Sequence, residues 1–140
     1  MKSFTSLIIA ISLLFVSLAA FAAEVATGPA EAAEKFFAGY VAVVVANKDT
    51  KAWVAKSKLA SAAFKAAYDK AMSGEEVDAD AVLQAQDVPS APFKAGKPAI
   101  NGDEAIVILT AKFGEDDHKV NVALVRVKGA WLIEAISSEE

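Results

Sequence analysis

Few residues in this chain could do chemistry, because it has one histidine, no cysteine and only two tyrosines. An acid–base site of the isomerase kind needs a buried carboxylate beside a tyrosine that donates a hydrogen bond. Asp87 with Tyr40 or Tyr68 is the pair that fits, since the apolar Val82-Leu83 precedes Asp87 and Pro89 stiffens the chain after it. The alternative is that both tyrosines belong to packed helix stripes and Asp87 caps a loop.

Metal binding has weak support in the sequence. His118 follows Glu115-Asp116-Asp117 in a predicted turn, where side chains are normally solvated. One histidine without cysteine cannot supply the three or four ligands of a zinc site. The acidic run from Glu75 to Asp80 would suit calcium, but the twelve-residue loop with its central glycine and closing glutamate is absent. We therefore expect no metal and no cofactor.

The first 22 residues are typical of an export signal. Lys2 provides a positive start, Leu7 to Ala20 is almost wholly apolar, and Ala20-Phe21-Ala22 fits the small-x-small cleavage rule. The apolar run is too short for a stable transmembrane helix, although a retained membrane anchor is the alternative. We expect residues 1–22 to be removed and the mature protein to be periplasmic or secreted.

After the signal we expect a flexible tail, residues 23–28, and one domain, residues 29–138. The 140 residues carry a formal net charge of −4, so a nucleic-acid or anionic-membrane partner has no electrostatic support. The absence of cysteine excludes disulfides and thiol chemistry.

The last third of the chain, Phe93 to Ser138, predicts three to four antiparallel strands. Asn101-Gly102 and Lys128-Gly129 are hairpin turn signals, because such turns need residues that tolerate positive φ. Pro98 confines the first strand to an edge, since proline cannot donate to the ladder.

A two-residue turn at Lys128-Gly129 predicts a register that pairs Leu124 with Ile133 and Val122 with Ala135. This register gathers an apolar core face from two strands: Val120, Val122, Leu124, Trp131, Ile133 and Ala135. A second apolar set falls on the opposite side or beside it: Ile106, Ile108, Val125, Leu132 and Ile136. Since a few helices cannot cover both faces, the second set predicts a homodimer or a bound partner.

Two or three helices precede the sheet. The first begins near Pro29 and carries Tyr40, a short second one follows Asp49 or Thr50 and carries Trp53, and a third runs from about Leu59 to Met72. These helices must pack on the sheet.

The closing pattern Gly129-Ala-Trp131-Leu-Ile133 resembles the last strand of the nuclear-transport-factor-like superfamily. The stretch from Asp78 to Asp87 is similar to a group of small exported bacterial domains of unknown function within it. The resemblance implies a cone-shaped, cystatin-like α+β fold with a tapering cavity. Residues at the mouth of that cavity would hold a ligand: Tyr40, Trp53, Tyr68, Gln84, Gln86 and Asp87.

The superfamily includes isomerases, dehydratases, ligand binders and immunity proteins, so the fold does not choose among them. Acid–base turnover requires a group with a shifted pKa, and this chain offers few candidates. The leading hypothesis is an exported, non-catalytic binding module for a small ligand or a protein partner. The alternatives are a small pocket enzyme of the isomerase or dehydratase kind and an immunity-type protein that neutralises a partner. An enclosed cavity would favour the first two, and a filled interior with a surface patch would favour the third.

Overall fold

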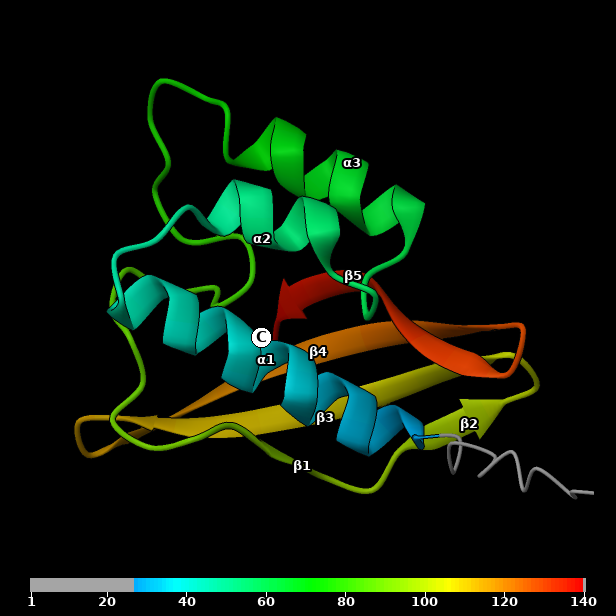
Figure 1. Cartoon of the computed structure of the whole chain (residues 1–140). Coiled ribbons are helices and arrows are strands. Elements are labelled where there is room, and N and C mark those ends of the chain that lie inside the picture. The colour runs from blue at the N-terminus through cyan, green and yellow to red at the C-terminus, as the bar shows by residue number, and fades with distance from the viewer. Residues whose placement is uncertain (1–26, 140) are drawn as a thin grey trace, which may run out of the picture.

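Three helices lie on one face of a five-stranded antiparallel sheet (Figure 1). The structure is a computed structural model that describes residues 27–139, so the predicted signal and most of the tail lie outside the described residues. The α+β class and the packing of helices on a sheet are confirmed. No helix between residues 27 and 139 is long and apolar enough to cross a bilayer.

The sheet is a meander with a divided edge. Its strands are β1 (Lys94–Ala95), β2 (Ala99–Asn101), β3 (Glu104–Phe113), β4 (Asp116–Val127) and β5 (Ala130–Ser138). Strands β1 and β2 both pair with the same edge of β3, and β4 and β5 follow on its other side. The predicted edge strand is therefore split near Pro98, which has no N–H for the ladder.

One of the two predicted hairpin turns lies where the sequence predicts it, and the other is displaced by one residue. Lys128 (φ 51°) and Gly129 (φ 81°) both have positive φ, as a type I′ turn requires. In the other turn, Asn101 pairs with Glu104, so Gly102 (φ 60°) and the residue after it occupy the central positions. That turn lies one residue further along the chain than predicted.

A β-bulge changes the predicted register of the last strand. Leu124 pairs with Ile133 as expected, but the register shifts between Ala123 and Leu124, so Val122 lies opposite Ile136. The placement of Ala135 on the core face is wrong, because Ala135 pairs with Ala123 and is exposed. Ile136 packs against the core instead, which also corrects its placement on the opposite face. The extra residue lets the larger side chain bury more apolar surface.

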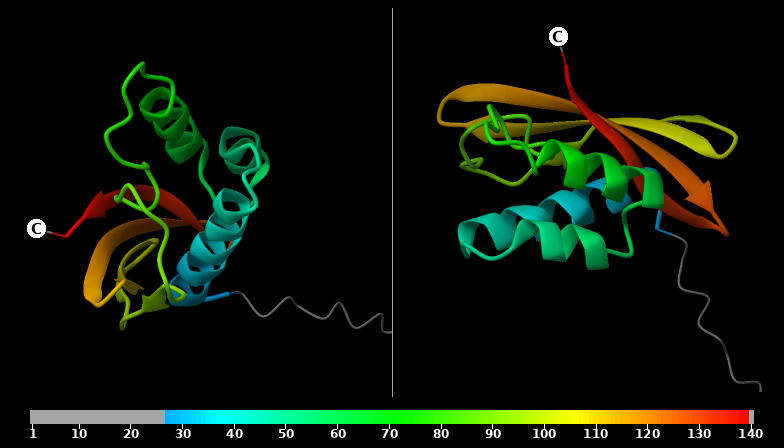
Figure 2. Two further views of the ribbon diagram at one scale, coloured as in Figure 1. Left: turned by 90° about the vertical axis from the view of Figure 1, so that its left-hand side faces the viewer. Right: turned by 90° about the horizontal axis from the view of Figure 1, so that it is seen from above.

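Helix α1 lies over the sheet, and the helices α2 and α3 lie next to each other beyond it (Figures 1 and 2). They are α1 (Pro29–Val45), α2 (Thr50–Lys56) and α3 (Ala62–Ala71). Helix α1 crosses the sheet and contacts β3 and β5, whereas α2 packs on α1 and α3 packs on α2 and β5. Asp49 caps α2 by accepting from the Ala52 amide at 3.0 Å. Ser61 caps α3 by accepting from the Phe64 amide at 3.1 Å, so α3 begins three residues later than predicted.

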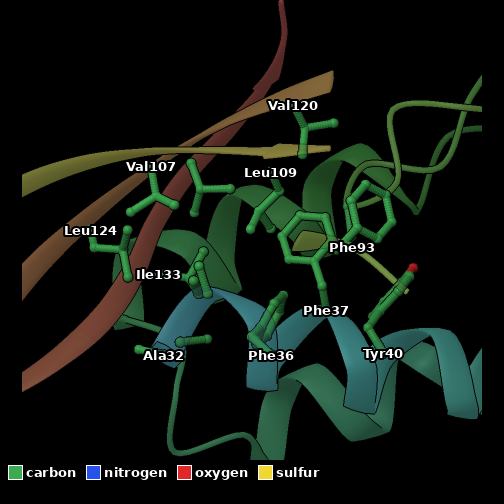
Figure 3. Packing of buried hydrophobic residues seen from close by; sticks show 14 of the residues in the cluster. Ala32, Phe36, Phe37, Tyr40, Phe93, Val107, Leu109, Val120, Leu124 and Ile133 are labelled. Carbon is green, nitrogen blue, oxygen red and sulfur yellow. The ribbon is translucent and has the colours of Figure 1, made fainter. Parts of the chain in front are cut away.

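Side chains occupy the space between α1 and the sheet. Phe36, Phe37 and Tyr40 point from α1 towards the core face, and each is fully buried (Figure 3). The facing strand residues are equally buried: Val107, Leu109, Val120, Leu124 and Ile133. The interior at this level is therefore packed with apolar side chains.

Candidate functional site

Tyr40, Tyr68 and Asp80 form a hydrogen-bonded group, here called the Tyr40 cluster. It joins α1 and α3 to the loop after α3. The two tyrosine hydroxyl oxygens are 2.8 Å apart, and Tyr40 donates to Asp80 Oδ2 at 2.5 Å. A tyrosine hydroxyl has one hydrogen, so Tyr68 donates to Tyr40 while Tyr40 donates to the carboxylate. The carboxylate at the end of this chain of hydrogen bonds is Asp80, which the sequence had suggested only as part of an acidic run.

The loop around Asp80 folds onto this carboxylate. Asp80 Oδ1 accepts from the amides of Val82 and Leu83 at 2.8 and 2.9 Å. The Asp80 amide donates to the Ala85 carbonyl at 3.0 Å, and the Asp80 carbonyl accepts from the Gln84 amide at 2.8 Å. Val82 and Leu83 are buried in the core, which draws Asp80 inward. An aspartate that accepts from amides two and three residues later uses the geometry of a helix cap, and this spacing is a usable sequence signal.

Tyr40 stays protonated in this environment. Burial raises the pKa of Tyr40 far above its ordinary range, and the hydrogen bond to Asp80 raises it further. The Tyr40 hydroxyl is thus a structural donor.

Asp87 lies away from the Tyr40 cluster. It is exposed and lines an open depression of about 420 Å³ with Val88, Phe113 and Gly114. The predicted pairing of Asp87 with a tyrosine is not found, because the buried Val82-Leu83 pair positions Asp80 instead.

The other predicted ligand-binding residues use their side chains within the protein. Trp53 packs on Phe36 and Tyr40, with ring centroids 5.3 and 6.0 Å apart. Gln84 donates to the Ala81 carbonyl at 2.7 Å. Gln86 likewise donates to the Asp78 carbonyl at 2.9 Å. Ligand binding by this set stays a prediction, and the structure gives its members packing and loop-closing roles.

His118 is half-buried in β4, which corrects its predicted place in a solvated turn. Its Nε2 lies 2.8 Å from the Leu83 carbonyl oxygen, which can only accept, so Nε2 carries the proton. The ring packs against Phe113 at 4.8 Å. His118 therefore ties the β3–β4 hairpin to the Asp80 loop. Within residues 27–139, no group of three or more potential metal ligands converges.

The predicted interface residues are divided by the bulge. Ile106 and Ile108 are 47% and 37% exposed on the face of the sheet that carries no helix. Val125 and Leu132 are half-buried on that face, whereas Ile136 belongs to the core side. One open depression of about 510 Å³ hollows this surface. Its lining contains apolar residues and two carboxylates, Glu104 and Glu134.

The fold is shared with solved structures of a bacterial effector-immunity complex. One chain of the native type VI effector-immunity complex Tae3-Tai3 from Ralstonia pickettii superposes with a TM-score of 0.68 and 19% identity, covering 81% of this chain and 97% of that chain. The selenomethionine form of that complex gives a TM-score of 0.63 and 20% identity, with 81% and 98% coverage. At this identity the likeness shows the α+β fold alone. The sequence matches no protein-family model and no curated protein.

Proposed function

We propose that this chain is an exported immunity-type protein that binds and neutralises a type VI effector. The observation that carries the proposal is the fold shared with a chain of an effector-immunity complex over 97% of that chain. An immunity protein acts by occupying a surface of its target, so it needs a stable scaffold and an exposed patch more than a catalytic group. Binding to a protein partner is also one of the two forms of the binding-module hypothesis that the sequence suggests.

The interior supports this choice over a pocket enzyme. The aromatic side chains of α1 fill the space above the sheet, and Tyr40 has no exposed surface. Its hydroxyl is already committed to Asp80, whose two oxygens together accept three hydrogen bonds. A base of the isomerase type must instead face a substrate proton. Five surface depressions formed by the described residues are open to solvent, and neither tyrosine lines any of the five.

The test is competition between sister strains of the natural host. A strain lacking this chain is mixed with its parent, and survival of the deletion strain is counted after contact. The parent should kill the deletion strain, because the matching effector finds no immunity protein. Full-length chain supplied from a plasmid should restore survival.

Two controls define the mechanism. A parent whose type VI secretion is disabled should spare the deletion strain. A plasmid form without residues 1–22 should give no protection, because the chain would stay in the wrong compartment. Equal survival of deletion strain and parent beside an active secretor would contradict the proposal.

A further inference from the structure

The helices leave one face of the sheet uncovered, here called the outer face (Figure 2). Alternate residues of β3, β4 and β5 form its apolar part: Ile106, Ile108, Ala123, Val125, Leu132 and Ala135. Four strands at a spacing of about 4.8 Å and ten residues at about 3.4 Å give roughly 650 Å². This approaches the ~800 Å² per partner of a standard protein interface. The outer face is therefore large enough to dock a protein.

The depression at one end of the outer face is apolar and acidic. Ile100, Ile106 and Val125 are among its apolar lining, and Glu104 and Glu134 supply carboxylates. No lysine or arginine lines it. Between residues 27 and 139, neither glutamate forms an ion pair, whereas Arg126 nearby is paired with Asp103. Two uncompensated carboxylates beside exposed isoleucines favour a cationic group with an apolar stem.

The opposite end of the outer face is neutralised within the chain. Lys112 lies 2.7 Å from Asp117, and Lys119 lies 3.7 Å from Glu139. A second copy packed face to face would offer these lysines to the acidic depression only by giving up its own ion pairs. The charge pattern thus favours a different protein, with a free cation, over a second copy.

We propose, resting on the proposed function, that the effector docks on the outer face and inserts a lysine or arginine side chain into the depression. The aliphatic stem packs on Ile106 and Val125, and the charged head lies against Glu104 and Glu134. Arginine is enriched among the buried interface residues that carry most of the binding free energy. The preference for arginine or lysine follows from charge complementarity.

The test complements the deletion strain with the full chain carrying Glu104→Lys and Glu134→Lys. This variant should lose affinity for the effector by a factor on the order of 30 or more, because a desolvated charge pair becomes a repulsion. Survival beside the parent should fall towards that of the deletion strain. The matched control is Glu75→Lys with Glu76→Lys, which changes the net charge equally at two exposed positions in the loop after α3, away from the outer face. The control should protect as the unaltered chain does.

The outcomes separate the docking proposal from the proposed function. Full protection by the Glu104/Glu134 variant, with wild-type protection intact, would overturn the docking surface and leave the immunity role standing. Equal loss from both double variants would overturn it too, since net charge alone would then be the cause. Failure of the unaltered chain to protect would overturn both. Light scattering checks the rival occupant: a wild-type dimer that Ile106→Lys converts to a monomer would assign the outer face to a second copy.

Discussion

Asp80 connects parts of the chain that lie far apart in sequence, because its carboxylate accepts hydrogen bonds from α1 and from its own loop. Tyr40 lies 40 positions earlier, and the amides of Val82 and Leu83 lie just after it. The loop between α3 and β1 contains no regular element, so these bonds, two buried side chains and the His118 contact with the Leu83 carbonyl hold it on the core. The stability of this loop should therefore depend strongly on the Asp80 carboxylate.

Replacing Asp80 tests this dependence. Asp80→Ala leaves the Tyr40 hydroxyl and two amides without an acceptor, which should lower the free energy of unfolding by about 2–4 kcal/mol. Asp87→Ala removes an exposed carboxylate and should change it by less than about 0.5 kcal/mol. Urea unfolding followed by circular dichroism measures both. If Asp80→Ala lowered the free energy of unfolding by as little as Asp87→Ala, the Tyr40 cluster would contribute little to stability.

Tyr40 should also make stability depend on alkaline pH. Its folded pKa lies above the unfolded value of about 10, so the stability from the neutral hydroxyl is present below pH ~10 and lost as pH rises beyond it. Tyr40→Phe is expected to start less stable and to lose less between pH 9 and 11. Melting temperatures of both forms across that range give the comparison, and parallel curves would exclude this role for Tyr40.

The sequence pattern predicts Asp87 as the carboxylate beside a tyrosine, whereas the structure has Asp80 in that place. Both aspartates flank the same apolar pair, and Pro89, which stiffens the chain after Asp87, favours the later one. Capping geometry decides otherwise, because an aspartate can accept from amides that follow it at two and three positions. Only Asp80 stands in that relation to Val82 and Leu83.

At the scale of elements, the contact between α1 and α2 depends on a residue without a side chain. A Cβ placed on Gly39 would lie 2.6 Å from Cζ2 of Trp53. The Trp53 ring is half-buried and packs on Phe36 and Tyr40. Gly39 is thus the position at which α2 approaches α1.

Gly39→Ala sets two effects against each other. Alanine improves helix propensity by about 1 kcal/mol, whereas overpacking against the Trp53 ring costs about 1–3 kcal/mol. We expect net destabilisation and a change in tryptophan fluorescence, measured in the same urea titration. Gly28→Ala controls only for the steric effect of the added methyl group, since nothing lies within 4 Å of its Cβ position and Gly28 is the N-cap of α1. A more stable Gly39→Ala would mean that Trp53 moves freely.

The elements themselves were largely predictable. Turn residues and apolar alternation predicted the β3–β5 meander, and the predicted pair Leu124–Ile133 is confirmed. The bulge was not predicted, because local alternation accepts Ala135 as a core residue and only packing against the helices favours Ile136. Such a one-residue shift depends on the tertiary core and is invisible in strand periodicity.

For the whole molecule, the α+β fold is shown and the function is a proposal. Membership of the nuclear-transport-factor-like superfamily stays a prediction, while the α+β architecture is shared with an effector-immunity complex chain. One scaffold can serve many functions, so the immunity role stays a proposal, and the outer face with its depression is the docking surface proposed for it. An immunity role also requires the chain to meet its partner in the right compartment.

Export should remove the first 22 residues of the chain. Signal cleavage needs small side chains just before the cut, so cleavage after Ala22 should give a mature protein that begins at Ala23. Intact-mass measurement of protein from the periplasmic fraction tests this. Ala22→Trp should retain residues 1–22, because the bulky side chain does not fit the cleavage rule, whereas the small replacement Ala22→Gly should still be cut. Exported wild-type protein that keeps its first 22 residues would contradict cleavage after Ala22, and the immunity role would then require a membrane-anchored form.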